Sequence, residues 1–414
     1  MSDFPVTLDD VRQAATYGAG VVRRTPLFGS GTFSDMAGCT VYLKAENLQV
    51  TGSFKIRGAL NKMARLTPDE RARGVVAASM GNHAQGVAYA ATHFGIRSII
   101  VMPVVASLSK YRATQSYGAE VVLHGDSIEE AMEEARRIVD ETGAVFVHPY
   151  DDWDIIAGQG TLALEVLSEL PDADALVVPL GGGGLMAGVA IAARALRPDI
   201  RLIGVQASGC ASFPGALAAG APVRLETART IADGIRVMQP GYKTFEVVRD
   251  LVDDVVTVDD EAISLAIVQL LERRKLVVEG AGATSLAALI YGAHGLPRDT
   301  KAVAVLCGGN IDIRLIGRII DYGLAILGHL LTLEVTVPDT PKQLMRVLGI
   351  CGDLGANISQ VEHFRGEMLV PVGSTRILLR METRDDEHQR TIVAALRDKG
   401  YQPRWSDPNA PVEA

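Results

Sequence analysis

The chain has 414 residues, a formal net charge of -9, 48% hydrophobic residues and 21% charged residues. This length exceeds that of a usual single domain, so we expect two or three separately cored units. The acidic balance, without a basic run that contains interleaved aromatic residues, argues against a nucleic-acid partner or an anionic membrane surface.

The cysteines and the N-terminus indicate a reducing compartment. Cys39, Cys210, Cys307 and Cys351 are widely scattered and form no CxxC pair, which predicts neither a disulfide framework nor a zinc site. The N-terminal segment MSDFPVTLDD is acidic and lacks the apolar region of a signal peptide. No apolar run approaches the roughly 20 residues of a membrane span. We therefore expect a cytoplasmic protein with no membrane partner.

From about residue 40 to residue 325, apolar runs alternate with alanine-rich segments. The strand candidates are VVAAS (75–79), SIIVMP (98–103), EVVLHG (120–125), VFVHPY (145–150), ALVVPL (175–180), RLIGVQ (201–206) and AVAVLC (302–307). Their nearly continuous apolar character is typical of parallel strands that are buried on both faces. Segments between them, such as residues 82–95 and 185–198, are expected to be helices. The pattern predicts an α/β fold with open parallel sheets, in which ligands bind beyond the carboxyl ends of the strands.

The pattern changes near residue 325. Strands are expected at residues 331–339, 357–364, 375–383 and 401–405, and helices at 340–356 and 385–400, with Thr340 as the cap of the first helix and Pro341 in its first turn. This β-α-β-β-α-β order is the ferredoxin-like arrangement. We expect one domain over residues 1–325, with a small subdomain at about 50–150 inserted in it, and a second domain over 326–414.

The segment ENLQVTGSFKIRGA (46–59) contains Lys55 between Phe54 and Ile56. A lysine in an apolar setting can act as a Schiff-base nucleophile, because desolvation favours the reactive neutral amine. Most lysines are nevertheless solvated surface residues, and the residues before Lys55 could form an ordinary turn.

The segment SMGNHAQG (79–86) lies between an expected strand and an expected helix. A turn at Ser79 and Gly81, followed by Asn82 and His83 at the helix start, presents unpaired amides that suit an anion such as a substrate carboxylate. The alternative is that Asn82 only caps the helix.

The segment GGGGLMAG (181–188) follows another expected strand. Four glycines, Gly181, Gly182, Gly183 and Gly184, before Leu185 let backbone amides converge on a phosphate at a helix N-terminus. The sequence is neither GxGxxG nor a Walker loop. A flexible linker is the alternative interpretation.

Two further strand ends carry chemical groups. Cys307 begins CGGN (307–310), and Glu279 lies in VVEGAGATS (277–285). The ordinary roles of such residues are a small buried side chain for the cysteine and a helix-start carboxylate for the glutamate.

In this order the four motifs resemble those of fold-type II pyridoxal-5'-phosphate enzymes, specifically threonine ammonia-lyases (threonine dehydratases) with one regulatory domain. The resemblance covers nearly the whole chain. It implies pyridoxal phosphate as cofactor, a hydroxy amino acid as substrate and a homo-oligomer, either a tetramer or a dimer.

The resemblance also implies residue roles. Lys55 resembles the lysine that forms the Schiff base, Phe54 the residue stacked on the ring, and Asn82 the ligand of the 3'-oxygen. Gly181, Gly182, Gly183, Gly184 and Leu185 resemble the phosphate loop, and Cys307 occupies the position that contacts the pyridine nitrogen. Glu279 is included among the cofactor-binding residues, while Ser79, Gly81, Asn82 and His83 are expected to bind substrate. Lys55 would then remove the α-proton as general base, leading to release of a 2-oxo acid and ammonia.

Two departures distinguish the chain from the serine racemases that it also resembles. Met80 stands where those enzymes place a serine that serves as the base on the second face of the substrate. Gln206 and Ser212 stand where serine racemases have acidic metal ligands, so we expect no divalent metal site there. A monovalent cation near residues 206–212 stays open as an alternative.

The segment from about 331 to 406 resembles an ACT-like domain, which in this family binds an amino-acid effector. We expect the effector to contact Pro338, Asp339 and Thr340, together with Asn357 and Ile358. Three alternatives remain open. The substrate could be L-threonine, with L-serine used more slowly; it could be another 3-hydroxy amino acid, such as serine, phenylserine or hydroxyaspartate; or the chain could be a non-catalytic amino-acid sensor.

Overall fold

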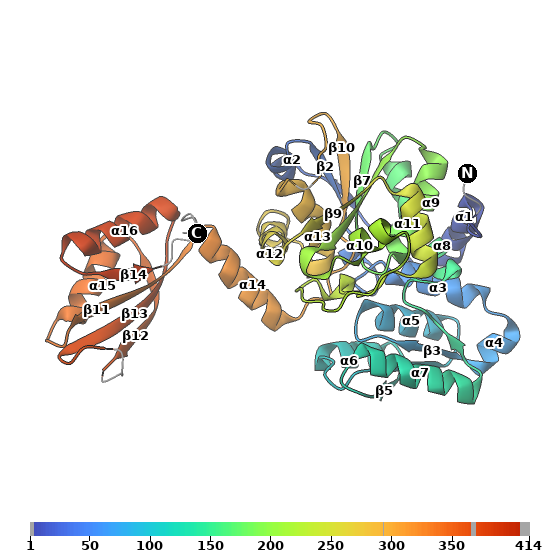
Figure 1. Ribbon diagram of the computed structural model, residues 1–414, viewed down its shortest axis with the longest axis horizontal. Coiled ribbons are helices and arrows are strands. Elements are labelled where there is room, and N and C mark those ends of the chain that lie inside the picture. The colour runs from blue at the N-terminus through green and yellow to red at the C-terminus, as the bar shows by residue number, and fades with distance from the viewer. Residues whose placement is uncertain (1–3, 293, 366–369, 406–414) are drawn as a thin grey trace. The chain divides into compact units, whose positions relative to one another are not determined.

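The computed structural model describes residues 4–292, 294–365 and 370–405. Two compact units divide the chain, Met1–Asp312 and Ile313–Ala414 (Figure 1). The first unit contains two sheets and the second contains one.

The larger sheet of the first unit has six strands. Their order is β1 (Leu27–Gly29), β2 (Thr40–Lys44), β10 (Lys301–Val305), β7 (Ala175–Pro179), β8 (Arg201–Ala207) and β9 (Asp254–Val258). All neighbours are parallel except β1, which is antiparallel to β2. The expected parallel sheet is therefore mixed at one edge. Central strand β7 is buried throughout, as a strand covered on both faces requires.

The smaller sheet contains β5 (Glu120–Leu123), β4 (Ser98–Met102), β3 (Val75–Ala78) and β6 (Val145–Phe146), in this order and all parallel. Alternate residues of β3 face opposite sides. Val75 and Ala77 pack with the apolar residues of α5 (Asn82–His93), whereas Val76 and Ala78 pack against α7 (Ile128–Thr142). This sandwich of helix, sheet and helix explains the continuous apolar runs of the central strands.

The remaining helices of the first unit connect these strands. They are α1 (Leu8–Gly18), α2 (Gly31–Ala37), α3 (Lys55–Arg65), α4 (Pro68–Arg73), α6 (Leu108–Ser116), α8 (Trp153–Glu169), α9 (Gly184–Leu196), α10 (Ser212–Ala219), α11 (Tyr242–Leu251), α12 (Asp260–Gln269) and α13 (Gly280–Ile290), with short helical turns at Glu46–Leu48, Ser208–Cys210, Asp233–Ile235 and Leu270–Arg274. Helix α3 packs against α5 and α8, and so lies between the two sheets.

The second unit begins with α14 (Ile313–Ile326). It continues as β11 (Leu330–Pro338), α15 (Gln343–Asp353), β12 (Asn357–Phe364), β13 (Ser374–Glu382), α16 (Asp386–Asp398) and β14 (Pro403–Trp405), which is the β-α-β-β-α-β order expected from the sequence. The sheet order is β12-β13-β11-β14, and every pair is antiparallel. Alternate residues of β11 and β13 form a core with α15 and α16.

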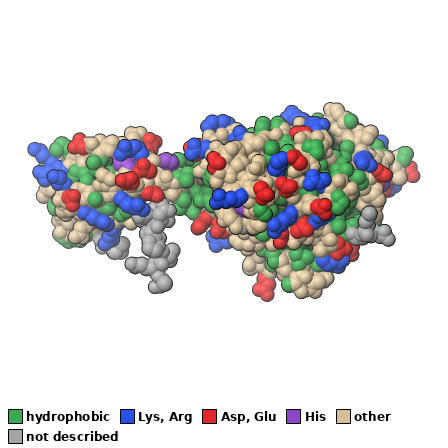
Figure 2. Space-filling view, turned by 90° about the horizontal axis from the view of Figure 1, so that it is seen from above, with side chains coloured by type: hydrophobic (Ala, Val, Ile, Leu, Met, Phe, Trp, Pro, Cys, Tyr) green, Lys and Arg blue, Asp and Glu red, His purple; other side chains and the backbone are tan. Residues whose placement is uncertain are grey.

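The start of α15 differs from the expectation. The helix begins at Gln343 after Lys342, whose φ is 73°, so Thr340 is not its cap and Pro341 is not in its first turn. Instead, the Thr340 hydroxyl accepts a hydrogen bond from the Gln343 side chain at 3.3 Å. No helix among the described residues is both long and apolar enough to span a bilayer. On the face of the first unit that Figure 2 presents, acidic and basic side chains are interspersed.

Candidate active site

Lys55 is the first residue of α3 and points toward the segment that follows β6. Its Nζ atom donates a hydrogen bond to the carbonyl oxygen of Pro149 at 2.7 Å and lies 5.2 Å from the centre of the Phe54 ring. Burial lowers the pKa of Lys55 to about 8, although the neighbouring Cys307 and Glu279 act in the opposite direction. At moderately alkaline pH a large fraction of this amine is therefore neutral, which is the form that acts as a nucleophile or base.

The segment from Val147 to Asp151 was not expected to contribute to the site. It joins the small sheet to α8 and supplies Pro149 to Lys55. The Val147 carbonyl lies 2.9 Å from Nε2 of His83, and Nδ1 of His148 accepts the backbone N–H of Asp151 at 2.8 Å. In the sequence this segment reads as the end of a buried strand. Only its polar residues after the apolar run, HPYD, could have indicated another role.

Two histidines beside Lys55 are held neutral. The pKa of His83 is lowered to about 3 and that of His148 to about 4, chiefly by burial. The charge of Lys55 contributes to both shifts, whereas the charge of Asp151 opposes the shift at His148. Both imidazoles are therefore neutral near pH 7 and do not act there as cationic acids. They serve as fixed hydrogen-bonding groups in the wall around Lys55.

Asn82 is held by two side chains from other parts of the chain. Its Nδ2 atom donates to Oε1 of Glu279 at 2.6 Å, and its Oδ1 atom accepts from Nδ2 of Asn310 at 2.7 Å. The cap of α5 is Gly81, so the alternative of Asn82 as a simple helix cap does not describe its side chain. Burial, followed by the charge of Asp233, raises the pKa of Glu279 to about 7. These contacts leave one Nδ2 hydrogen of Asn82 for a further acceptor.

The end of β10 brings Lys55 and Glu279 together. The Cys307 carbonyl accepts the backbone N–H of Phe54 at 3.1 Å, and the next carbonyl, that of Gly308, accepts the N–H of Glu279 at 3.0 Å. A Cβ atom at Gly308 would lie 2.5 Å from Oε1 of Glu279, so any side chain there would displace the Glu279 carboxylate. Burial, with the charge of Glu279, raises the pKa of the Cys307 thiol well above its usual value, which keeps the thiol neutral.

The four glycines form a tightly enclosed turn. Gly183 is the cap of α9 and has a φ of 99°, in the region that favours glycine. A Cβ atom at Gly182 would lie 2.5 Å from the Tyr150 ring. The Thr244 hydroxyl donates to the Gly182 carbonyl at 2.6 Å. Because these contacts fix the conformation of the turn, they disfavour the interpretation of the four glycines as a flexible linker. The first backbone amides of α9 have no acceptor within the helix, so they can bind an anion.

The turn from Ser79 to Asn82 is partly exposed, while His83 behind it is buried. The backbone N–H of Gly81 donates to the Ser79 hydroxyl at 3.2 Å. Met80 lies in the same turn and has no group that accepts a proton. The turn therefore offers amides and a hydroxyl to an anion.

These residues together fit a phosphorylated aldehyde. The glycine turn at the start of α9 suits a phosphate, and the pKa of the lysine is lowered. A neutral thiol follows β10, and the Asn82 amide lies at the start of α5. A family model described as "Pyridoxal-phosphate dependent enzyme" matches residues 19–308.

The chain belongs to the pyridoxal-phosphate-dependent enzyme family. The L-threonine ammonia-lyase of Thermotoga maritima is 48% identical over 400 residues, which cover 96% of this chain and 99% of that protein. The catabolic L-threonine dehydratase TdcB of Escherichia coli is 44% identical over 321 residues, 77% of this chain and 98% of that protein. Among solved structures, maize serine racemase aligns with a TM-score of 0.73 and 38% identity, covering 76% of this chain and 97% of that one.

As a member of this family the chain uses pyridoxal phosphate, and the resemblance to fold-type II enzymes is confirmed. Gln206 and Ser212, which stand where serine racemases have acidic metal ligands, contact each other. Gln206 donates to the Ser212 hydroxyl at 3.4 Å and accepts the backbone N–H of Phe213 at 2.8 Å. Among the described residues, no group of three or more His, Cys, Asp and Glu side chains is arranged to hold a metal ion.

The five expected effector contacts fall into two groups in the second unit. The strand register pairs Pro338 with Ser374 at the start of β13, whereas Asn357 pairs with Glu382 at its end. Eight residue steps at about 3.3 Å separate these ends by roughly 26 Å. Pro338, Asp339 and Thr340 therefore do not share one small-ligand site with Asn357 and Ile358 of the same chain.

Proposed function

We propose that this protein is a threonine ammonia-lyase, which converts L-threonine to 2-oxobutanoate and ammonia. The observation that carries the proposal is the similarity to the Thermotoga maritima L-threonine ammonia-lyase, which extends over both units of the chain. Lys55, close to a neutral Cys307 and to the Asn82 amide, provides the chemistry that this activity needs.

Pyridoxal phosphate supplies an electron sink for the bonds at the α-carbon of an amino acid. We assign Lys55 as its point of attachment and as the general base, Phe54 to the ring face, and Asn82 to the 3'-oxygen. Gly181, Gly182, Gly183, Gly184 and Leu185 are assigned to the phosphate.

The neighbouring residues tune this arrangement. A neutral Cys307 thiol next to the pyridine nitrogen cannot stabilise a protonated ring as a carboxylate would. Glu279 fixes one hydrogen of the Asn82 amide and so sets the direction of the other. The neutral thiol would favour prompt loss of the substrate hydroxyl group.

The turn from Ser79 to His83 is assigned to the substrate carboxylate. Backbone amides at a helix start attract an anion, and His83 stays neutral behind them. Met80 cannot return a proton to the opposite face of the α-carbon, so racemisation is disfavoured despite the similarity to maize serine racemase. L-Serine would be a slower substrate that yields pyruvate.

The second unit is proposed to be an ACT-like regulatory domain for an amino-acid effector, with isoleucine and valine as the first ligands to test. Its four-stranded antiparallel sheet with two helices supports this assignment. Because Pro338, Asp339 and Thr340 lie far from Asn357 and Ile358, a ligand touching both groups would bind between two copies of the chain. We accordingly propose that the protein is a homo-oligomer. We also propose that it is cytoplasmic. The four cysteines are free and buried, which is compatible with a reducing compartment.

A panel of hydroxy amino acids tests the proposed substrate. The purified protein is incubated with L-threonine, L-serine, phenylserine or hydroxyaspartate, and release of each 2-oxo acid is measured, with chiral analysis for D-serine. We expect the highest kcat/KM for L-threonine and negligible D-serine. A higher kcat/KM for another substrate, or D-serine formed as fast as pyruvate, would overturn the proposal.

A further inference from the structure

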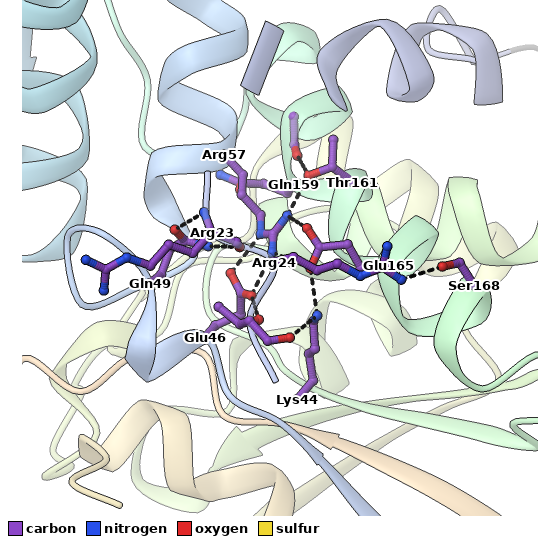
Figure 3. A network of polar contacts seen from close by, with 12 residues as sticks. Arg23, Arg24, Lys44, Glu46, Gln49, Arg57, Gln159, Thr161, Glu165 and Ser168 are labelled. Carbon is purple, nitrogen blue, oxygen red and sulfur yellow. Dashed lines mark hydrogen bonds and ion pairs between the residues drawn. The ribbon is translucent and has the colours of Figure 1, made fainter. Parts of the chain in front are cut away.

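A group of buried charged side chains lies beside the first turn of α3, the helix that begins at Lys55 (Figure 3). Its members, here called the Arg57 network, are Lys44, Glu46, Arg57 and Glu165. The side chains of Lys44 and Glu46 are fully buried, that of Arg57 is 1% exposed and that of Glu165 is 17% exposed. Two positive and two negative groups balance one another.

Arg57 uses every N–H group of its guanidinium. Nε and Nη2 donate to the two carboxylate oxygens of Glu46, each at 2.7 Å. Nη1 and Nη2 donate to Glu165 at 2.7 and 3.0 Å, and Nη1 also donates to the Thr161 hydroxyl at 3.1 Å. A planar fork with five donors is a property of arginine that lysine lacks.

The network joins four elements, because Glu46 lies in the short helical turn Glu46–Leu48 and the other members lie in β2, α3 and α8. Arg57 follows Lys55 by two residues in the first turn of α3, and Glu165 belongs to α8. Lys44 ends β2 and pairs with Val305 of β10, two residues before Cys307. Lys44 also donates to Glu165 at 2.6 Å. The position of Lys55 is therefore connected through charged groups to the strand end that carries Cys307.

Contacts outside the Arg57 network also hold α3 against α8. Helices α3 and α8 touch at two glycines, since a Cβ atom at Gly158 would lie 2.5 Å from Cα of Gly58. Further along α3, Nδ2 of Asn61 donates to the Asp154 carbonyl of α8 at 2.6 Å, and Lys62 pairs with the Asp154 carboxylate at 3.0 Å. The Arg57 network adds its side-chain bonds in the first turn, next to Lys55. Buried ion pairs often contribute less to stability than apolar residues of the same volume, whereas their directional bonds fix orientation.

We propose that Arg57 is a positioning residue for Lys55, and that the Arg57 network fixes the rotation of the first turn of α3 so that Nζ of Lys55 meets the cofactor aldehyde. The inference rests on the proposed function only in taking Lys55 as the point of cofactor attachment. Substrate turnover plays no part in it.

The test measures attachment of pyridoxal phosphate to the apoprotein. Arg57→Lys keeps the charge but loses the fork. Glu46→Gln combined with Arg57→Met leaves Lys44 and Glu165 as a balanced pair and keeps an acceptor for the Thr25 hydroxyl, which donates to Glu46. Arg24→Gln is the matched control, because Arg24 pairs with Glu169 of the same helix α8 at an exposed position. Borohydride trapping at timed intervals gives the rate of attachment to Lys55, and thermal unfolding reports stability.

We expect attachment to Lys55 to be roughly ten- to hundredfold slower in both network variants, because a small misplacement of a reacting group costs rates of this order. The double variant should retain a cooperative unfolding transition within a few degrees of the unsubstituted protein, and Arg24→Gln should attach cofactor normally. Normal attachment in a folded network variant would overturn the proposal. So would loss of folding in both variants, because stability alone would then account for the network. A protein that attaches the cofactor normally and yet releases no 2-oxobutanoate would contradict the proposed function and leave this inference intact.

Discussion

Lys55 and Glu279 have pKa values that are shifted toward neutrality from opposite sides, and burial is the first cause of both shifts. Such pairs are typical of active sites, where a base and its neighbours must exchange protons near neutral pH. Their partners come from distant segments, since Pro149 binds Lys55, and Asn82 binds Glu279. The raised pKa of Glu279 can therefore be tested directly by substitution.

The pH dependence of stability should change when Glu279 is replaced by glutamine. The folded carboxyl has a pKa of about 7 against an ordinary 4.5, so the folded apoprotein binds more protons than the unfolded chain between these values. The free energy of unfolding should therefore fall by about 3 kcal/mol as the pH rises from 4.5 to 7, at roughly 1.4 kcal/mol per unit. Glu279→Gln should flatten this slope and be the more stable form at pH 8. Urea unfolding of both apoproteins across this range is the measurement, and equal slopes would refute the assignment.

At the scale of elements, the glycine turn before α9 depends on its neighbours. From the sequence, Gly183→Asp is expected to weaken cofactor binding far more than folding. The structure changes this expectation, because Gly183 has a φ of 99° and its Cβ would lie 2.6 Å from Thr244, so any side chain there also strains the fold. The hydrogen bond from Thr244 to Gly182 is a more selective place to perturb the turn.

Thr244→Val should loosen the turn without adding volume. The change removes the hydroxyl donor of the buried Gly182 carbonyl, which keeps only the longer bond from the Gly241 N–H at 3.4 Å, and we expect a cost of about 1 kcal/mol of unfolding free energy. We expect the Kd for pyridoxal phosphate to rise about tenfold, which corresponds to roughly 1.4 kcal/mol. Thr244→Ser retains the hydroxyl and is the control. Fluorescence titration of the apoproteins measures the Kd, and equal affinities for the two variants would show that Thr244 does not shape the turn.

The sequence predicts elements well where one local pattern decides them. The continuous apolar runs at β3, β4, β7 and β8 indicate buried parallel strands, and alternation with turn residues indicates the order of the second unit. Strands β1, β2 and β9 were missed, and β6 spans only Val145–Phe146. β1 and β9 form the two edges of the larger sheet, and both an edge position and the turn from β6 toward α8 depend on tertiary contacts.

The residues of the candidate site likewise divide into those that lie in a local sequence motif and those that do not. Lys55, Asn82 and the glycine turn occur in recognisable motifs at strand ends. The bonds of Pro149, Asn310 and Thr244 carry no local signal, because each joins segments more than 60 residues apart. The Arg57 network is hidden for the same reason, since its carboxylates come from η1 (Glu46–Leu48) and α8.

At the scale of the whole molecule, the division at Asp312 separates a unit that carries every proposed catalytic residue from one that carries none. The Escherichia coli dehydratase matches 321 residues over nearly its whole length, so a protein of about the first unit's size exists alone. The second unit has its own core of residues from β11, β13, α15 and α16. Regulation and catalysis are therefore expected to be separable.

Deleting residues 327–414 should leave an active enzyme that no longer responds to its effector. Isoleucine and valine are titrated against both proteins, and activity and substrate cooperativity are recorded. Allosteric control requires that the effector bind two states of the full chain with different affinity, so only the full chain should respond. A flat response of the full chain, with no binding to the isolated second unit, would sink the regulatory proposal.

The central claim is that the chemistry of this protein is carried by pyridoxal phosphate on Lys55. The most direct measurement is borohydride reduction of the purified, cofactor-loaded protein, followed by peptide mapping by mass spectrometry. The account predicts a single reduced adduct, on the peptide that contains Lys55, and its loss in Lys55→Ala with the fold retained. An adduct on another lysine of the unsubstituted protein, or an unchanged adduct yield in Lys55→Ala, would contradict it.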